Sequence, residues 1–234
     1  YLTTNYNFAD QTFNGTVVNT PNFEFDKPEY RLSSYLGRMN ISVKGKYLFT
    51  ASLRQDGSSK FNPDNRFAVF PSGAVAWKLK EEGLFKNMKS LSDLKLRASY
   101  GVTGQQDGIG NYDYITNYFK SETTAQYQFG NSFYQMYRPA GYYANRKWEQ
   151  TASFNVALDY GLFNNRLQGS VEYFIRTSKD LILDRPVTWL SGYSTISENV
   201  GELQNKGLEV DVKLVAVDKS ADNKGFKWTT SFNF

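Results

Sequence analysis

Hydrophobic and polar residues alternate along most of this chain, with the period of two that is typical of β-strands whose two faces meet different surroundings. The clearest example is segment 207–214, where aliphatic side chains at every second position alternate with charged ones. Eight segments show the pattern: 33–43, 46–54, 67–79, 94–100, 148–160, 166–176, 207–214 and 226–234. The pattern therefore predicts an all-β protein.

The connections between these segments differ in length, and shorter and longer ones alternate along the chain. Lys44-Gly45-Lys46 predicts a tight hairpin turn, and the connection at 161–166 is also short. The others are moderate at 80–93 and 218–225 and long at 55–66, 104–147 and 178–198. This order is typical of an antiparallel up-and-down array with its short turns at one end and its long loops at the other. A helical turn is expected over 81–88.

Two environments fit the alternation, a soluble β-sandwich and a transmembrane β-barrel. A sandwich turns its apolar face inward, whereas a barrel turns it toward lipid and lines its lumen with the polar face. Strands of about ten residues and loops that sort by length favour the barrel. Aromatic residues near the predicted strand ends, where an interfacial girdle forms, also favour it. These are Tyr47, Trp77, Trp148, Tyr160, Phe163 and Trp228.

The composition of the chain removes several classes of function. The 234 residues include no Cys and no His, which excludes a Ser-His-Asp triad, a Cys nucleophile, a zinc finger and a disulfide scaffold. Aromatic residues make up 17%, too many for a disordered chain, and a net charge of +4 is too small for a nucleic-acid binder. No run of apolar residues is long enough for a transmembrane helix. The N-terminus lacks an initiator Met and the features of a signal peptide, so we read the chain as mature or as a piece of something longer.

Five segments carry the most specific local signals. The loop within the second of them, Asp56-Gly57-Ser58-Ser59, favours a tight turn at the end of a strand. The five are Tyr35-Leu36-Gly37-Arg38-Met39-Asn40, residues 46–61, residues 70–77, residues 94–105 and residues 199–209. Trp148-Glu149-Gln150-Thr151 lies between the fourth and the fifth.

In this order the segments resemble the SusC/RagA family of TonB-linked outer-membrane transporters of Bacteroidetes. The family forms are close to Y-L-G-R-x-N, K-Y-L-x-T-A-S-x-R-x-D-G-S-S-x-F, F-P-S-x-x-x-A-W, L-K-L-R-A-S-Y-G-x-T-G-x-Q and N-x-G-x-x-x-N-K-G-x-E. The resemblance covers residues from about 30 to 234. It implies that residues 1–234 are an internal stretch of the receptor β-barrel domain, about eight strands of a 22-strand barrel, without the plug and the TonB-contacting segment.

The resemblance also implies a function and a set of partners. It implies TonB-driven import of oligosaccharides or peptides across the outer membrane of a Gram-negative bacterium, together with a SusD-like surface lipoprotein that caps the barrel. The lipid bilayer is a further expected partner. No nucleic acid, cofactor or metal is expected.

The long connection 104–147 supplies the candidate contact residues for substrate or for the lipoprotein. Aromatic rings stack on sugar rings and give large contact areas at a low cost in entropy. The candidates are Tyr112, Tyr114, Tyr118, Tyr127, Tyr134, Tyr137, Tyr142 and Tyr143. Packing of the loop on itself or against the lipoprotein explains the same residues without substrate contact and is the favoured interpretation, while substrate contact stays open.

The polar faces of the predicted strands supply the candidate lumen-facing residues, which are Arg38, Arg54, Arg97, Glu172, Asp211 and Lys213. They either line the route of the substrate or pair with one another and with the plug.

Two alternatives come from other classes of protein. A soluble carbohydrate-binding β-sandwich would use the same tyrosines. An enzyme would use loop carboxylates as paired acids, as in glycoside hydrolysis, but no spacing sets two of them at a defined distance, so we expect no enzyme. The acids considered are Asp56, Asp64, Asp107, Asp113, Asp180, Asp184 and Glu198.

Overall fold

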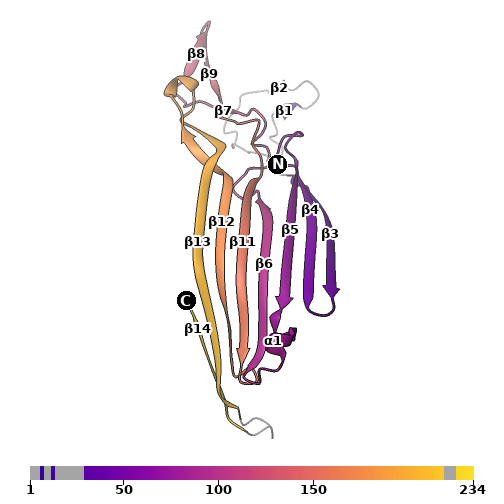
Figure 1. Ribbon diagram of the computed structural model, residues 1–234. Coiled ribbons are helices and arrows are strands. Elements are labelled where there is room, and N and C mark those ends of the chain that lie inside the picture. The colour runs from indigo at the N-terminus through magenta and orange to yellow at the C-terminus, as the bar shows by residue number, and fades with distance from the viewer. Residues whose placement is uncertain (1–5, 8–11, 14–28, 219–224) are drawn as a thin grey trace.

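An eight-stranded antiparallel sheet dominates the computed structural model, which describes residues 6–7, 12–13, 29–218 and 225–234 (Figure 1). Its strands are β3 (Leu32–Val43), β4 (Tyr47–Ser58), β5 (Phe67–Lys78), β6 (Leu91–Gln105), β11 (Glu149–Leu162), β12 (Leu167–Pro186), β13 (Thr195–Asp218) and β14 (Lys227–Asn233). Neighbours in the chain are neighbours in the sheet, in the order β14-β13-β12-β11-β6-β5-β4-β3. The predicted all-β up-and-down array is therefore confirmed, and within the described residues the sheet is not closed.

The sheet is a single layer. Large apolar side chains on one of its faces are exposed, among them Leu53, Phe154 and Leu208. A sandwich would bury such a face under a second sheet, and the described residues place none there. The structure therefore gives the soluble-sandwich alternative no support. No helix in the described part of the chain is long and apolar enough to cross a membrane.

Several strands are longer than the alternation predicted, β12 and β13 most of all. The expectation of a long loop over 178–198 was wrong, because β12 continues to Pro186 and β13 begins at Thr195. Asp180 has a positive φ of 57° and Val200 has no partner in the ladder, so both strands change phase within this stretch. Because of this change of phase, the alternation of apolar and polar residues is interrupted in the sequence, and the strands are not recognisable there from a period of two. Similarly, β4 extends through the expected loop as far as Ser58.

The predicted sorting of connections by length is only partly right. The turns at 44–46 and 163–166 are tight, and the loop at 106–148 is the longest connection between neighbouring strands of the eight-stranded sheet. However, the connection at 79–90 lies at the tight-turn end and is longer than the loops at 59–66 and 187–194. The last of these contains the 3₁₀ turn η2 (Trp189–Ser191).

The long loop carries strands of its own, which the sequence did not indicate. β7 (Tyr118–Lys120) pairs with β10 (Tyr137–Pro139), and between them β8 (Gln126–Phe129) and β9 (Ser132–Gln135) form a hairpin. This hairpin stands out from the loop end of the molecule (Figure 1). A further pair, β1 (Tyr6–Asn7) and β2 (Thr12–Phe13), lies near the N-terminus.

The connection 79–90 contains the predicted helical turn, as η1 (Leu79–Glu81) followed by α1 (Gly83–Lys86). Lys80 stabilises it, because its Nζ donates to the carbonyl oxygens of Phe85, at 3.0 Å, and Met88, at 2.9 Å. These carbonyls lie at and beyond the C-terminal end of α1, and each also accepts from a backbone N–H, Phe85 from Met88 at 3.1 Å and Met88 from Leu91 at 3.2 Å. The lysine thus holds the turn in a compact form.

Glu82 ties this turn to the neighbouring strands. Its Oε1 accepts from Trp77 Nε1 and from Tyr47 Oη, both at 3.1 Å, and its Oε2 accepts from Lys46 Nζ at 3.2 Å. The Tyr47 and Trp77 rings stack with centroids 6.0 Å apart. The hydrogen bonds from Trp77, Lys46 and Tyr47 lower the pKa of Glu82 below its usual value. Glu82 is therefore ionised at neutral pH, and the stability that it contributes is lost only as the pH falls through its lowered pKa.

Removing the charge of Glu82 is expected to loosen this end of the sheet. At pH 7, Glu82→Gln should make the amides of 44–47 and 79–90 exchange severalfold faster, because three hydrogen bonds to a carboxylate weaken. Hydrogen exchange read by mass spectrometry measures this. The matched control is Glu81→Gln, at a residue with no side-chain hydrogen bond or ion pair found among the described residues. Equal exchange in the two variants would contradict the role assigned to Glu82.

Candidate functional site

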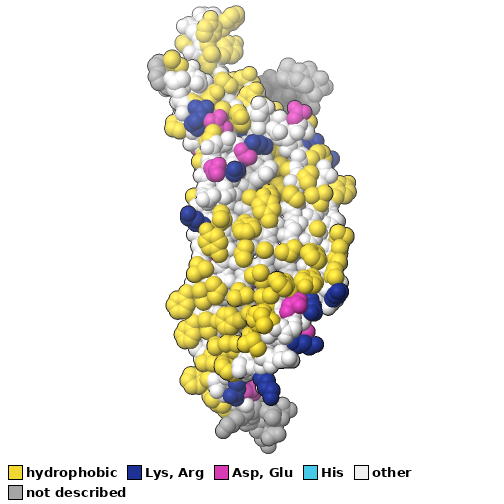
Figure 2. Space-filling model, viewed as in Figure 1, with side chains coloured by type: hydrophobic (Ala, Val, Ile, Leu, Met, Phe, Trp, Pro, Cys, Tyr) yellow, Lys and Arg dark blue, Asp and Glu magenta, His cyan; other side chains and the backbone are white. Residues whose placement is uncertain are grey.

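The register of the sheet separates two chemically different faces. Val171 lies opposite Leu158 and Val210, and this face is apolar. Figure 2 shows hydrophobic side chains in a broad band over the sheet, with charged side chains above and below it. Exposed apolar bands of this extent mark contact with lipid or with another protein.

The opposite face carries all six residues predicted to line a lumen. Directly opposed residues point to the same side, and Arg97 opposes Ala157, which opposes Glu172. The same ladders place the remaining members of the set on this side of the sheet, which are Arg38, Arg54, Asp211 and Lys213. We call this surface the charged face.

A network of ion pairs crosses three strands of the charged face. Asp159 of β11 accepts from Lys95 at 2.8 Å and from Arg97 at 3.0 Å, both on β6. Arg97 reaches on to Glu172 of β12 at 2.8 Å. The network therefore brings together two of the six predicted residues, Arg97 and Glu172.

The other four predicted residues do not join this network. Arg54 pairs with Asp56 of its own strand at 2.7 Å. For Arg38, Asp211 and Lys213 the described residues provide no ion-pair partner. These charges remain available on the charged face.

A small core lies at the loop end of the sheet, and it contains most of the buried apolar side chains among the described residues. The Trp148 ring stacks on Phe61 with centroids 5.0 Å apart and meets Phe70 edge-on at 5.7 Å. Ile109, from the long loop, completes the cluster. Trp148 Nε1 also donates to the carbonyl oxygen of Arg66 at 3.2 Å. This core fixes both ends of the long loop to the strands around it.

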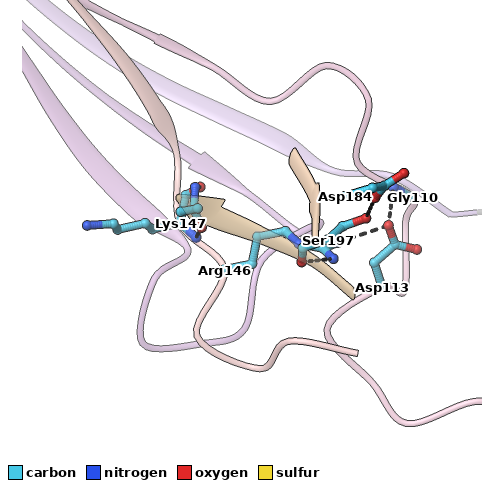
Figure 3. Close-up of polar contacts among 7 residues, drawn as sticks. Gly110, Asp113, Arg146, Lys147, Asp184 and Ser197 are labelled. Atoms are coloured by element: carbon cyan, nitrogen blue, oxygen red, sulfur yellow. Dashed lines mark hydrogen bonds and ion pairs between the residues drawn. The ribbon is translucent and has the colours of Figure 1, made fainter. Parts of the chain in front are cut away.

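Arg146 is a buried charged group of this region, with 4% of its surface exposed. Its Nη1 donates to Asp113 Oδ2 at 3.0 Å, and its Nη2 donates to the carbonyl oxygen of Ser197 at 2.8 Å (Figure 3). Asp113 also accepts from the backbone N–H of Gly110 at 2.8 Å. One guanidinium thus links the two ends of the long loop to the start of β13.

Asn199 stabilises the same junction through Lys147, the residue that follows Arg146. Its Nδ2 donates to the carbonyl oxygens of Lys147, at 2.9 Å, and Asp180, at 2.7 Å. Its Oδ1 accepts from the backbone N–H of Lys147 at 2.9 Å. The side chain therefore links the end of the long loop to the irregular part of β12.

The eight predicted tyrosines do not form one site. Tyr127 and Tyr134 oppose each other on the β8–β9 hairpin, and Tyr118 and Tyr137 belong to the β7–β10 ladder. All four are exposed. Tyr112 and Tyr142 are also exposed, whereas Tyr114 and Tyr143 are half-buried.

Five of the seven carboxylates considered for catalysis, Asp56, Asp113, Asp180, Asp184 and Glu198, are engaged in structural contacts. Asp180 pairs with Lys147 at 2.9 Å, Glu198 with Arg185, and Asp184 accepts from the Ser197 hydroxyl. In the described part of the chain, no group of three or more acidic residues is arranged to hold a metal ion. Sequence reasoning missed Arg146, whose importance depends on contacts with Asp113 and Ser197, 33 and 51 positions away in the chain.

The whole chain matches the family model described as TonB dependent receptor-like, beta-barrel, over residues 1–234. The chain belongs to this family, whose members are outer-membrane transporters and not enzymes. It is 39% identical over 203 residues to TonB-dependent receptor SusC of Bacteroides thetaiotaomicron, and this match covers 86% of the chain and 20% of that protein. It is 36% identical over 225 residues to TonB-dependent receptor P39 of Formosa agariphila, covering 96% of the chain and 21% of that protein.

The chain also resembles solved structures of RagAB, a peptide transporter. The RagAB peptide importer in its open-open state matches with a TM-score of 0.74 at 29% identity, covering 87% of this chain and 21% of that one. The RagAB peptide transporter matches with a TM-score of 0.73 at 28% identity, covering 93% and 23%. The chain thus spans about a fifth of the length of the relatives it matches. The expected resemblance to SusC/RagA transporters is confirmed.

The ion-pair network predicts a specific cost for removing Arg97. Arg97→Met leaves Glu172 without its cation and should lower the free energy of unfolding by about 1 kcal/mol, a modest value because the Arg97 side chain is 39% exposed. Equilibrium denaturation of the protein refolded into lipid vesicles measures it. The control is Arg176→Met on the same face of β12, which removes a cation that has no ion pair among the described residues. Adding Glu172→Gln to Arg97→Met should recover part of the loss, and equal stability of the two single variants would refute the role of the network.

Proposed function

We propose that this chain is an internal stretch of the barrel of a SusC-like, TonB-dependent transporter, which imports oligosaccharides or peptides across the outer membrane of a Gram-negative bacterium. The observation that carries the proposal is the division of one sheet into an exposed apolar face and a charged face. Outer-membrane barrels need this division, because one face meets lipid and the other meets water or a plug. Membership of the receptor family supports the same assignment.

In this proposal the charged face lines the lumen. Arg38, Asp211 and Lys213 then offer charges to the plug or to passing substrate, while Arg97 and Glu172 neutralise each other. A lipid-facing position would be costly for any of these side chains, by roughly 2–4 kcal/mol for Arg or Lys at the bilayer midplane. The six residues therefore favour an aqueous interior over a lipid-facing exterior.

Further parts of the proposal concern energy and partners. Import would be driven by the TonB complex through a segment outside the 234 residues. The capping partner would be a SusD-like lipoprotein at the loop end of the sheet. The β8–β9 hairpin suits that contact, because Tyr127, Phe129, Phe133 and Tyr134 are all more than half exposed on it. Exposed aromatic clusters of this kind are common in protein interfaces.

Adjacent residues on β12 test the orientation of the sheet. Val171 lies between Leu158 and Val210 on the apolar face, and Ser170 lies between Asp159 and Asp211 on the charged face. Val171→Arg should cost about 2–4 kcal/mol and reduce the amount of protein assembled in the outer membrane. Ser170→Arg should be tolerated, because the new cation stays on the charged face and lies opposite Asp211, which has no ion pair among the described residues, although Asp159 already pairs with Lys95 and Arg97. Heat-modifiable migration in gels and quantitative blotting of outer membranes measure assembly, and equal assembly of both variants would refute the orientation.

The hairpin can be removed without breaking the rest of the loop. Met136 N–H donates to the carbonyl oxygen of Ala125 at 3.0 Å, so the chain enters and leaves the hairpin at adjacent points. Replacing residues 126–135 by Asn-Gly, which forms a two-residue turn, should preserve assembly and abolish co-purification of the lipoprotein. Uptake of labelled oligosaccharides and peptides by cells should fall with it.

The control for this deletion keeps the hairpin and changes only Gln126→Ala and Gln135→Ala at its base, which oppose each other. This variant should retain both the lipoprotein and uptake. Unchanged co-purification and uptake after the deletion would show that the hairpin does not dock the partner.

A further inference from the structure

A hollow of about 410 Å³ lies between the long loop and the turn that joins β12 to β13. Its size falls within the range of small-molecule sites, roughly 300–1,000 Å³. Three stretches of the chain supply its walls, namely the first part of the long loop, β10 with the residues that follow it, and the facing ends of β12 and β13. The side chains that matter here are Asp113, Phe119, Arg138, Tyr142, Asp184 and Tyr193.

The walls of the hollow are held together without any ligand. The buried Arg146, itself part of the lining, joins Asp113 on one wall to Ser197 on another (Figure 3). Gly141 packs so closely against the start of β13 that a Cβ there would lie 2.7 Å from the carbonyl oxygen of Thr195. The hollow is therefore a preorganised shape, which lowers the entropic cost of binding.

The charges on the walls balance. Arg138 and Arg146 contribute two cations, and Asp113 and Asp184 contribute two anions. Arg146 and Asp113 already pair with each other at 3.0 Å. Arg138 is exposed and has no ion pair among the described residues, while Asp184 accepts one hydrogen bond, from Ser197. A ligand with a large net charge of either sign gains nothing overall from such a set.

The remaining chemistry of the walls fits hydroxyl groups and sugar rings. Guanidinium and carboxylate groups are planar and present two donors or two acceptors side by side, which matches a pair of neighbouring hydroxyls. Phe119, Tyr142 and Tyr193 add aromatic surfaces that pack on the C–H faces of sugar rings. Aromatic surface, paired donors and paired acceptors thus occur together in one neutral hollow.

We propose that this hollow binds a segment of a neutral oligosaccharide, with Arg138 and Asp184 as its hydrogen-bonding residues and Tyr142 and Tyr193 as its ring contacts. The inference rests on the proposed import function and narrows its substrate to the saccharide class. It also gives the long loop two separate tasks, since the hollow lies at the base of the loop and the β8–β9 hairpin contributes nothing to its lining.

The test uses the complete transporter purified in detergent, with isothermal titration calorimetry as the readout. The saccharide probes are maltohexaose, cellohexaose and mannohexaose, and the peptide probes are tetra-alanine and its Lys- and Glu-containing variants. Arg138→Met and Asp184→Asn should each weaken binding of the preferred hexasaccharide about tenfold, the effect of losing one hydrogen bond to a charged group. The matched control is Lys120→Met, which opposes Tyr137 on the same ladder and does not line the hollow. Its affinity should equal that of the unmodified protein.

Several outcomes would overturn the proposal. Hexasaccharide binding that is unchanged in both hollow variants would show that the site lies elsewhere. Binding of the peptides but of no hexasaccharide would refute the saccharide class. Binding of none of the probes would refute the site as proposed. Because both altered side chains are exposed, a folding defect is not expected, and heat-modifiable migration in gels verifies the fold of each variant.

Failure of the transport function itself is recognised separately. Cells that take up neither saccharides nor peptides through the intact protein would refute the proposed function whatever the calorimetry shows. Cells that take up peptides, with calorimetry showing no hexasaccharide bound, would leave import standing and remove only the proposed site.

Discussion

The backbone hydrogen bonds between neighbouring strands determine almost everything else in this structure. They fix the register, and the register decides which side chains share a face of the sheet. Arg97, Asp159 and Glu172 come from three strands and meet only because Ala157 stands opposite both Arg97 and Glu172. A slip of one residue would move these charges into the apolar band. The ladder therefore protects the separation of the two faces on which a barrel depends.

The period of two was sufficient to predict the strands and the side of the sheet on which each side chain lies. In 207–214 the alternation of Leu208 with Glu209 is undisturbed, and the structure places them on opposite faces. The prediction failed where the alternation is broken, near Asp180 and Val200, since a strand with a bulge no longer shows a single period. It also failed inside the long loop, where β7 to β10 are short and depend on each other for pairing.

The motifs of the sequence gain a physical meaning at the loop end. Phe61, Phe70 and Trp148 belong to three different motif segments, and together they form the core that anchors the long loop. Asn199 of the last motif links that loop to β12. A motif identifies residues such as Phe61 and Trp148 in the sequence, but only the fold shows that they contact each other. For the same reason the hollow was not predictable, since its walls come from segments about 80 residues apart, such as those of Asp113 and Tyr193.

The irregularity shared by β12 and β13 has a consequence for how this sheet can change in evolution. Asp180 and Val200 are each left out of the ladder, so the two strands change phase together and resume pairing above this point as far as Pro186 and Thr195. Deleting only one of these residues would shift the loop-end part of its strand by one residue. The side chains there would then point to the opposite face from those of the neighbouring strand. Losing both would restore the match. Insertions and deletions at these two positions should therefore be inherited as a pair, although the positions lie 20 apart in the sequence.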